Sequence, residues 1–409
     1  MKLKQFALAT TALTMIASAS WADNNEADVD QIGSQHSASV DQAAGNGNEA
    51  DVDQQNKRNT ADITQSGDDN KSTVLQTGRD GEATDLVSGD DNTLSTTQTS
   101  YDNISENDVA GDDNEVTVDQ DGGWGVFSGT FGNDSSVTIA DDANENIISI
   151  TQDGENTSTV EVNGAGSNGN NVTVDQAGLL TRGTNTSTVT IDGSANDVDV
   201  EQDGRSNVST VSVAGGAAGF GNTIKIDQWG VGSTSTATVS GGDNTLTVEQ
   251  FVGDNSSTAS ITGDSNNVSV TQAVLDNTAD LMIDGDSNTL NVWQAGISNN
   301  QITADIYGDD NNTAGNFSGA AAGALGISGL QAGDLVQIGY NNDIDLNVGT
   351  AGAGSNDNLF AFGQYGSDNA IEATIKGGDN NQAVIVQAGS SNFTSLVQNG
   401  SNNNAGITQ

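Results

Sequence analysis

Short segments in which polar and apolar residues alternate recur along nearly the whole chain. The clearest of them read Asn-x-apolar-x-apolar-x-Gln-x-Gly, as in residues 114–122 and 288–296. Alternation with a period of two residues is typical of a β-strand that buries one face. The pattern therefore predicts strands whose Asn, apolar and Gln side chains all point to the same, inner side.

The segments are spaced regularly. Four consecutive copies begin 22 residues apart, and a Gln follows each Asn by six residues; these residues are Asn222, Gln228, Asn244, Gln250, Asn266, Gln272, Asn288 and Gln294. Segments with smaller residues lie between them, at 233–239, 255–261 and 277–283. A constant period of this length is typical of solenoids, in which each repeat buries its apolar face against its neighbours. We therefore predict an all-β fold, a β-solenoid (β-helix) of about 17 two-strand coils with 22 residues in each and with ladders of stacked Asn and Gln side chains inside.

Gly-Asp-Asp-Asn or Gly-Gly-Asp-Asn segments separate many of the predicted strands, at residues 67–70, 89–92, 111–114, 241–244, 308–311 and 377–380. Gly, Asp and Asn tolerate positive φ, and Asp and Asn side chains form turns with the backbone. Proline, which would remove a donor from the ladder, is absent from the chain. These segments predict tight corners between strands.

The first residues differ from the repeats. Lys2 and Lys4 precede an apolar run at 6–16 and small residues up to Ala22, an order typical of a secretory signal peptide. We expect cleavage after Ala22, with Ala19 as the alternative, and a secreted mature chain. No later segment is apolar enough to predict a membrane span, and the absence of cysteine excludes disulfide bonds.

The remaining chain divides by its repeats and its charge. After the signal peptide at 1–22, we expect N-terminal acidic repeats at 23–120, an irregular loop at 121–133, central repeats at 134–313, an Ala/Gly-rich insertion at 314–334 and C-terminal repeats at 335–409. We interpret the loop and the insertion as loops that bulge from the solenoid. The net charge of −46 argues against nucleic acid as a partner, because phosphate recognition needs a basic surface.

The two ends of the chain differ in charge. Residues 380–409 contain no charged side chain, whereas the first repeats carry an acid at nearly every outward position. An uncharged, Gln- and Asn-rich end is prone to pair edge to edge with another chain. The predicted assembly edge consists of Val384, Val386, Gln387, Phe393, Leu396 and Gln398.

Residues 65–76 read Gln-Ser-Gly-Asp-Asp-Asn-Lys-Ser-Thr-Val-Leu-Gln, and residues 54–65 follow the same spacing with Asn56 in place of the Gly. This pattern resembles the curlin repeat of the curli subunits of Gram-negative bacteria. The resemblance implies a β-solenoid that passes through the periplasm, leaves the cell unfolded through a dedicated outer-membrane pore, and is nucleated at the cell surface. It also implies that the chain polymerises with itself into extracellular amyloid fibres for adhesion and biofilm matrix. Compared with a typical curlin subunit, this chain is longer, more acidic and interrupted twice.

Little in the sequence indicates catalysis. The single histidine, His36, takes the place of a repeat Asn, and Arg58, Arg79, Arg182 and Arg205 are scattered singly, so no basic cluster is expected. We therefore predict that the protein is not an enzyme, and we assign no catalytic, cofactor-binding or metal residues.

Two binding functions stay open as alternatives. Rows of corner carboxylates could bind calcium diffusely, although the Gly-Gly-x-Gly-x-Asp repeat of calcium-loaded β-rolls is missing. Outward threonines could form a flat hydroxyl array that binds ice or another surface; they are Thr234, Thr236, Thr238, Thr245, Thr247, Thr258 and Thr278. Trp229 and Trp293 are also expected to point outward. A monomeric secreted β-solenoid adhesin or ice-binding protein is thus the alternative to a fibre subunit.

Overall fold

The computed structural model describes residues 24–122, 132–164, 166–178, 184–215, 220–313 and 315–409. These residues form 31 β-strands and one α-helix. The chain divides into two compact units, residues 1–185 and 186–409, and in each the strands form two parallel sheets. The predicted all-β solenoid is confirmed, with about 16 turns.

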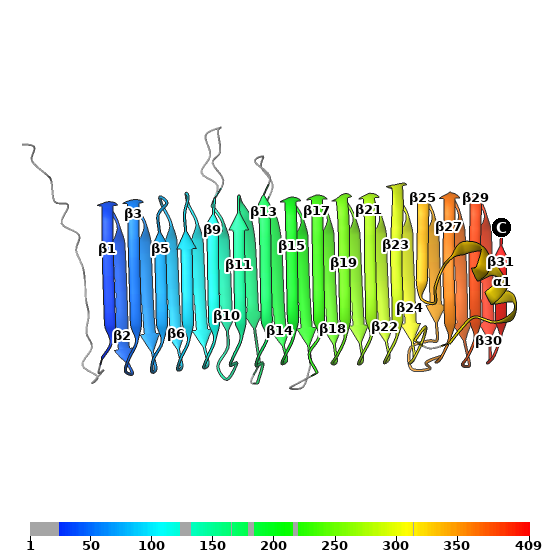
Figure 1. The fold of residues 1–409 in the computed structure, drawn as a ribbon, viewed down its shortest axis with the longest axis horizontal. Helices are drawn as coiled ribbons and strands as arrows, with labels where there is room; N and C mark the ends of the chain where they lie inside the picture. Colours follow the sequence, from blue (N-terminus) through cyan, green and yellow to red (C-terminus); the bar gives the residue numbers. More distant parts are fainter. Residues whose placement is uncertain (1–23, 123–131, 165, 179–183, 216–219, 314) are drawn as a thin grey trace, which may run out of the picture. The chain divides into compact units, whose positions relative to one another are not determined.

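In the first unit, consecutive strands alternate between the two sheets, so that one pair of strands makes one turn (Figure 1). One sheet contains, in spatial order, β1 (Glu26–Ser34), β3 (Glu49–Lys57), β5 (Lys71–Gln76), β7 (Thr93–Gln98), β9 (Glu115–Asp121), β11 (Ile147–Asp153) and β13 (Asn171–Gly178). The other contains β2 (Ser37–Ala44), β4 (Thr60–Ser66), β6 (Glu82–Ser88), β8 (Ile104–Ala110), β10 (Asp134–Ile139) and β12 (Asn156–Val162).

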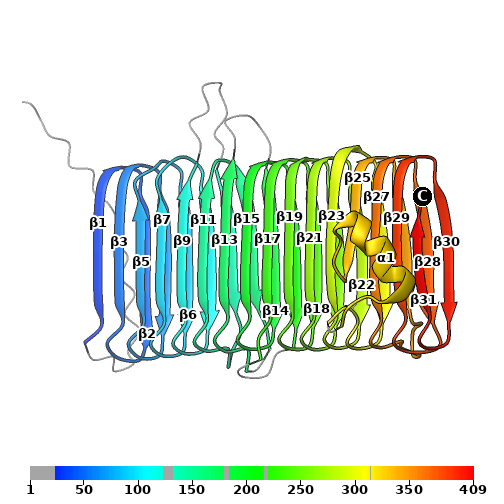
Figure 2. The same cartoon turned by 45° about the vertical axis from the view of Figure 1, so that its right-hand side comes forward.

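The second unit repeats this arrangement (Figure 2). Its odd-numbered strands are β15 (Asp197–Arg205), β17 (Thr223–Val231), β19 (Thr245–Gly253), β21 (Asn267–Leu275), β23 (Thr289–Ser298), β25 (Asp334–Tyr340), β27 (Leu359–Ser367), β29 (Gln382–Ser390) and β31 (Asn404–Thr408). Its even-numbered strands are β14 (Asn185–Asp192), β16 (Val208–Ala214), β18 (Thr234–Ser240), β20 (Ser256–Thr262), β22 (Thr278–Asp284), β24 (Gln301–Tyr307), β26 (Asp343–Val348), β28 (Ala370–Lys376) and β30 (Phe393–Asn399).

The sequence repeat sets the register of both sheets. In the first unit Gln54 pairs with Gln76, which lies 22 residues further along the chain. Some turns contain longer segments between their strands: Gln120 and Gln152 are 32 residues apart, and Gln294 and Gln337 are 43 residues apart. These longer turns use residues that the regular period would have placed in an additional coil, which explains why the solenoid has fewer turns than expected.

Alternation along each strand separates the core from the surface. In β19, Leu246, Val248 and Gln250 are fully buried, whereas Thr247 and Glu249 lie on the outer side and are partly exposed. Parallel in-register stacking then places aliphatic side chains of successive turns on top of one another, so each turn excludes water from its neighbours.

One turn of the first unit has a polar core. Asp85 in β6 takes a position that Ile63 occupies in the preceding turn, and it is almost completely buried. Its Oδ1 accepts a hydrogen bond from Asn107 Nδ2 at 2.8 Å, and Ser72 donates to its Oδ2. Burial raises the pKa of the Asp85 carboxyl, because charge is disfavoured away from water.

The predicted tight corners are confirmed, and the four residues of the Gly-Asp-Asp-Asn segment share three roles. In residues 67–70, Gly67 and Asp69 have positive φ of 102° and 56°. Asp68 accepts a hydrogen bond from the backbone N–H of Asn46 in the preceding turn at 2.7 Å. Asn70 points inward and donates to the carbonyl of Gly89 in the following turn at 2.7 Å. The corner carboxylates therefore connect the backbones of successive turns.

The structure corrects the interpretation of residues 314–334 as a bulging loop. Residues Gly319–Ser328 form helix α1, which lies against β29 and β31 at the C-terminal end of the second unit (Figures 1 and 2). Ala321 and Ala324 pack there with Val384 and Val386 of β29. Alanine favours a helix, and the outward valines offer an apolar surface that the helix covers. Residues 123–131, most of the other predicted loop, lie outside the described residues.

We expect Ala321→Asp to detach α1 and to destabilise the last turns by about 2–4 kcal/mol, because Ala321 is completely buried and a carboxylate there would have no partner. The measurement is the urea unfolding midpoint together with hydrogen exchange of β29 and β31. Ala320→Asp is the control, since Ala320 is exposed and a carboxylate in the first helical turn is favoured by the helix dipole. Equal effects of the two variants would show that the helix does not stabilise these turns.

Candidate assembly surfaces

The predicted ladder glutamines form one continuous chain of hydrogen bonds inside the second unit. The Nε2 atoms of Gln228, Gln250 and Gln272 each donate at 2.8 Å to the Oε1 of the Gln in the following turn, and the last acceptor is Gln294. Each Nε2 also donates to a backbone carbonyl of the opposite sheet, as from Gln250 to Thr234 at 3.0 Å. All four side chains are buried, so their amides are satisfied entirely within the protein.

The predicted asparagines form a second ladder at the corners. The backbone N–H and the Nδ2 of Asn244 both donate to Asn222 Oδ1, at 3.1 and 2.9 Å, and the contact repeats at Asn266 and Asn288. Asn244 Nδ2 also donates to the carbonyl of Gly263 at 2.7 Å. These bonds replace the backbone partners that a tight corner removes.

The two ladders run in opposite directions. A Gln donates to the following turn, whereas an Asn donates to the preceding turn. A turn therefore presents different hydrogen-bonding groups on its two sides. This polarity distinguishes the two ends of the stack.

The first end surface is the open side of β1 and β2, which we call the N-terminal face. Asn25, Ala27, Val29 and Gln31 point inward in the first turn but are only half-buried, whereas the β3 residues stacked on Ala27, Val29 and Gln31 are fully buried. The N–H of Glu26 donates to Asn48 O at 2.8 Å. In a parallel ladder the N–H groups alternate in direction, so those of Ala27, Val29 and Gln31 face the open side.

The second end surface is the open side of β30 and β31, which we call the C-terminal face. Its half-buried inward residues in the last turn are Asn403, Ala405 and Ile407, followed by Gln409. The N–H of Gln409 donates to Val386 O at 2.9 Å. By the same alternation, the N–H groups of Asn404, Gly406 and Thr408 face the open side.

The structure changes the composition of the predicted assembly edge. Val384 and Val386 are covered by α1, and Gln387 lies inside the solenoid, where it donates to Gln409 Oε1 at 3.1 Å. These three residues belong to β29, which β31 covers, so the expectation that they form the edge is wrong. The expected C-terminal repeats at 335–409 include β31, but its residues were not assigned to the edge, although 403–409 carry the Asn-x-Ala-x-Ile-x-Gln pattern of a repeat strand.

The other three predicted edge residues lie in β30, the last strand of its sheet. Leu396 is half-buried and Gln398 is buried, and Gln398 Oε1 has no hydrogen-bond partner within the described residues. Phe393 points outward and is 56% exposed. Leu396 and Gln398 therefore contribute to the C-terminal face, whereas Phe393 contributes to the side of the solenoid.

The exposed aromatic residues lie elsewhere. Trp229 and Trp293 are 46% and 55% exposed, on the outer face of the odd-numbered strands. Within the described residues, no group of three or more His, Cys, Asp or Glu side chains is arranged to hold a metal ion. The outward threonines range from half-buried to exposed on two different sheets.

Comparison with known protein families identifies the repeat. The family described as curlin associated repeat matches residues 22–55, 57–84, 193–230 and 378–409. The chain carries curlin-associated repeats. The matched regions include β1 and β2 at one end and β29, β30 and β31 at the other, so both end faces are built from curlin repeats. None of the curated proteins matches the chain.

The curlin repeat is a structural unit rather than a catalytic one, and its family is typical of extracellular, curli-type proteins. Among the described residues, α1 is the only helix, and no helix has the length and apolarity needed to cross a membrane. The predicted signal peptide falls within residues 1–23, which the structure does not describe.

Proposed function

We propose that this curlin-repeat protein is secreted and assembles with itself, end to end, into extracellular amyloid-type fibres that serve adhesion and the biofilm matrix. The observation that carries the proposal is the match between the two end faces. Both are open sheet edges with unpaired backbone groups and half-buried apolar residues. Other proteins cover or block such edges, because an open edge can pair with a strand of another chain.

The two faces have the same inward pattern. Asn403, Ala405, Ile407 and Gln409 repeat the order of Asn25, Ala27, Val29 and Gln31 at the same spacing. Stacking 403–409 of one copy beneath 25–31 of the next copy continues the register that joins neighbouring turns within the chain. The even-numbered residues of β31 then donate their open N–H groups to carbonyls of the odd-numbered residues in and next to β1, and the N–H groups of β1 donate back, as in a parallel ladder.

The polarity of the ladders selects head-to-tail stacking. In this orientation Gln409 can donate to Gln31 of the next copy, and Asn25 of that copy can donate to Asn403, in the directions that both ladders have within the chain. Two identical faces could not continue both ladders, because each would bring like groups together.

Charge favours the same orientation. The outward residues of β1 are Glu26, Asp28 and Asp30, whereas those of β31 are Asn404, Gly406 and Thr408. Head-to-tail stacking therefore places three acids beside uncharged residues. Two N-terminal faces in contact would place acid beside acid, which is destabilising in paired strands.

By analogy with the curli system, export through an outer-membrane pore and nucleation at the cell surface belong to the same proposal. The chain would leave the cell unfolded and acquire its turns outside. A self-assembling structural protein needs no catalytic site, which agrees with the structural character of the repeat.

Proline at the open edge tests the proposal. Thr408→Pro combined with Val397→Pro removes N–H groups that face the open side and leaves the bonds of β31 and β30 to the chain intact. We expect fibre growth, followed by thioflavin fluorescence and electron microscopy, to slow at least about tenfold, because each addition would lose backbone hydrogen bonds of about 0.5–1.5 kcal/mol each.

The matched control is Thr408→Ala with Val397→Ala, which shortens the same side chains and keeps both N–H groups. It should grow at nearly the rate of the parent and be accelerated by preformed seeds. Equal growth of the proline and alanine variants would refute edge pairing at this face. A parent chain that stays monomeric with seeds present would instead favour a surface-binding solenoid.

A further inference from the structure

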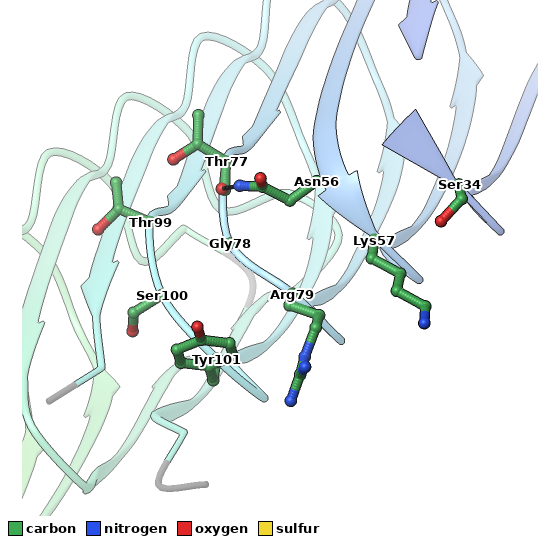
Figure 3. Close-up of a pocket in the computed structure, with 9 residues that line it drawn as sticks. All are labelled: Ser34, Asn56, Lys57, Thr77, Gly78, Arg79, Thr99, Ser100 and Tyr101. Atoms are coloured by element: carbon green, nitrogen blue, oxygen red, sulfur yellow. Dashed lines mark hydrogen bonds between the residues drawn. The ribbon is translucent and has the colours of Figure 1, made fainter. Parts of the chain in front are cut away.

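The geometry points to a binding site for an acidic saccharide, of the uronic-acid type, at one corner of the first unit. The site is a pocket of 390 Å³ at the carboxyl ends of β1, β3, β5 and β7 (Figure 3). We call it the basic corner; its chemically active residues are Lys57, Thr77, Arg79, Thr99, Ser100 and Tyr101.

The solenoid brings these residues together from separate repeats. Lys57, Arg79 and Tyr101 are spaced by 22 residues and pair as successive parallel bridges, so their side chains stack in one column across three turns. The expectation that the basic residues are scattered singly is therefore wrong at this corner. The chain has only ten Lys and Arg residues, and Lys57, Arg58 and Arg79 lie here.

Ion pairs with neighbouring acids leave part of this positive charge available to a ligand. Arg58 forms a two-point ion pair with Asp80, and this pairing lowers the pKa of the Asp80 carboxyl. Arg79 Nε lies 3.3 Å from Asp80 Oδ2 but makes no hydrogen bond. Of the three ion pairs found within the described residues, none involves Lys57. Lys57 and Arg79 are thus the cations that a carboxylate ligand can approach.

The Tyr101 ring holds Arg79 in position. The Arg79 Cζ atom lies 4.9 Å from the centre of the ring, in a cation–π contact. A guanidinium held in this way keeps its planar set of N–H donors in a fixed orientation, which suits two-point binding of a carboxylate. The contact therefore prepares Arg79 for an anionic ligand.

The rest of the lining suits a sugar. Figure 3 shows Lys57, Arg79 and Tyr101 along one side of the pocket and the Thr77 and Thr99 side chains on the other. Hydroxyl groups can both donate to and accept from sugar hydroxyls, and an aromatic ring can pack against the C–H face of a pyranose. Successive turns are about 4.8 Å apart, a spacing comparable to one sugar ring, so a chain with one carboxylate per ring can follow the column of cations.

Other anionic partners fit less well. A peptide cannot add as a strand, because the N–H groups of Thr77 and Arg79 already donate to Gln98 and Ser100 in the next turn, both at 3.0 Å. Duplex DNA carries a charge every ~1.7 Å, far more than two available cations can neutralise on a chain of net charge −46. A sparsely charged saccharide held by hydroxyls and one ring avoids both difficulties.

The basic corner does not depend on fibre assembly. Lys57, Arg79 and Tyr101 lie at the corner of the second to fourth turns, and none of them belongs to an end face. These three residues are consequently available in a single chain and in a stack of chains, so failure of the site would leave the end-to-end proposal untouched.

The test is calorimetric titration of the full-length chain with tetragalacturonate at about 150 mM salt, where distant charges are screened. Lys57→Gln with Arg79→Gln is expected to weaken binding at least about tenfold, because both cations that would pair with the carboxylates of the ligand are lost. Tyr101→Leu, which leaves the charge unchanged, should weaken it at least about threefold. The matched control, Lys225→Gln with Lys376→Gln, removes the same charge from the second unit and should bind like the parent.

Two further ligands identify the chemistry. Maltotetraose, a neutral sugar of equal length, and tripolyphosphate, a compact anion, should both bind at least about tenfold more weakly than tetragalacturonate. Equal affinity for tripolyphosphate would overturn the assignment to a saccharide, and equal affinity of the parent and the double variant would overturn the site. The urea unfolding midpoint checks folding; if the double variant is destabilised, Lys57→Gln alone, whose side chain forms none of the ion pairs above, must still weaken binding.

Discussion

Alanine at all four ladder positions, Gln228, Gln250, Gln272 and Gln294, is expected to unfold the second unit. Each substitution leaves buried polar groups without partners. In the fourfold variant these are the backbone carbonyls to which the four Nε2 atoms donate, such as that of Thr234 for Gln250, and the Oε1 of Gln337, to which Gln294 donates. An unsatisfied buried group costs about 1–3 kcal/mol, and a folded domain is stable by only about 5–15 kcal/mol. Four such losses in one stack amount to about 4–12 kcal/mol, which is comparable to the whole stability of a folded domain.

The measurement is urea unfolding of the full-length chain, followed by far-ultraviolet circular dichroism. The matched control replaces one outward residue from each of the same strands by alanine, at Lys225, Thr247, Ser269 and Asn291, which form one column on the surface. We expect loss of strand signal for the ladder variant and a nearly unchanged midpoint for the control. Overlapping unfolding curves for the two would exclude a stabilising role of the ladder.

The fold can be predicted from the sequence because the 22-residue period and the two-residue alternation both indicate the same stack of strands. A spacing of 22 residues makes Gln250 the neighbour of Gln228 and Gln272, and alternation makes all three point inward. In a parallel in-register stack, contacts between neighbouring turns follow directly from residue numbers. The corners follow for a similar reason, since positive φ is needed at positions such as Asp69 and favours the residue types found there.

The departures arise where a contact is not periodic. Val384 and Val386 belong to an apolar run that the sequence pattern assigns to an open edge. In the structure, helix α1 at 319–328 covers these two side chains. Likewise, Asp85 occupies an apolar position that alternation alone places in the core, and hydrogen bonds with side chains around it, including those of Asn107 and Ser72, stabilise its burial. Asn107 lies in the following turn and Ser72 in the same turn as Asp85, and both contacts depend on residue types found at this one place.

The basic corner shows a different limit. The expectation of singly scattered basic residues included Arg79 but not Lys57, and it compared residues only with their neighbours along the chain. Applying the 22-residue period to Lys57 and Arg79, as was done for Asn and Gln, would have placed them in adjacent turns. At the C-terminal face, Val384, Val386 and Gln387 were assigned to the edge in place of β31, although the inward residues of β31 repeat the pattern of those in β1.

The protein is also expected to become more stable as the pH falls from neutral toward about 4. Outward acids stack in columns. The pKa of Asp51 is raised above its ordinary value of 3.8 by partial burial and then by Asp28, Asp53 and Glu49. The pKa of Asp91 in a corner column is raised by desolvation and by Asp113 and Asp69. A carboxyl with a raised pKa binds more protons in the folded state than in the unfolded state, so the free energy of unfolding increases as the pH decreases through that range.

Asp80 limits the pH range in which the free energy of unfolding increases on acidification. Its pKa is lowered, first by the hydrogen bonds from Arg58, so the stabilisation from that pair is complete above 3.8 and is lost as the pH falls through the lowered value. The unfolding midpoint should consequently rise between pH 7 and about pH 4 and fall again in stronger acid. Most proteins behave in the opposite way, because their carboxylates are paired with cations, whereas here 56 acids face ten Lys and Arg residues.

Urea midpoints across this pH range test the effect. They are measured with the Thr408→Pro, Val397→Pro chain, whose slower assembly, by at least about tenfold, reduces interference from fibres. Asp51→Asn should raise the midpoint at pH 7 and reduce its pH dependence, because the amide occupies the same space without charge. Added salt at pH 7 should recover only the part of the gain that comes from repulsion between acids, since screening does not remove the cost of burial. A urea unfolding midpoint that falls steadily from pH 7 to pH 4 would mean that neither burial nor repulsion among the stacked carboxylates destabilises the folded chain.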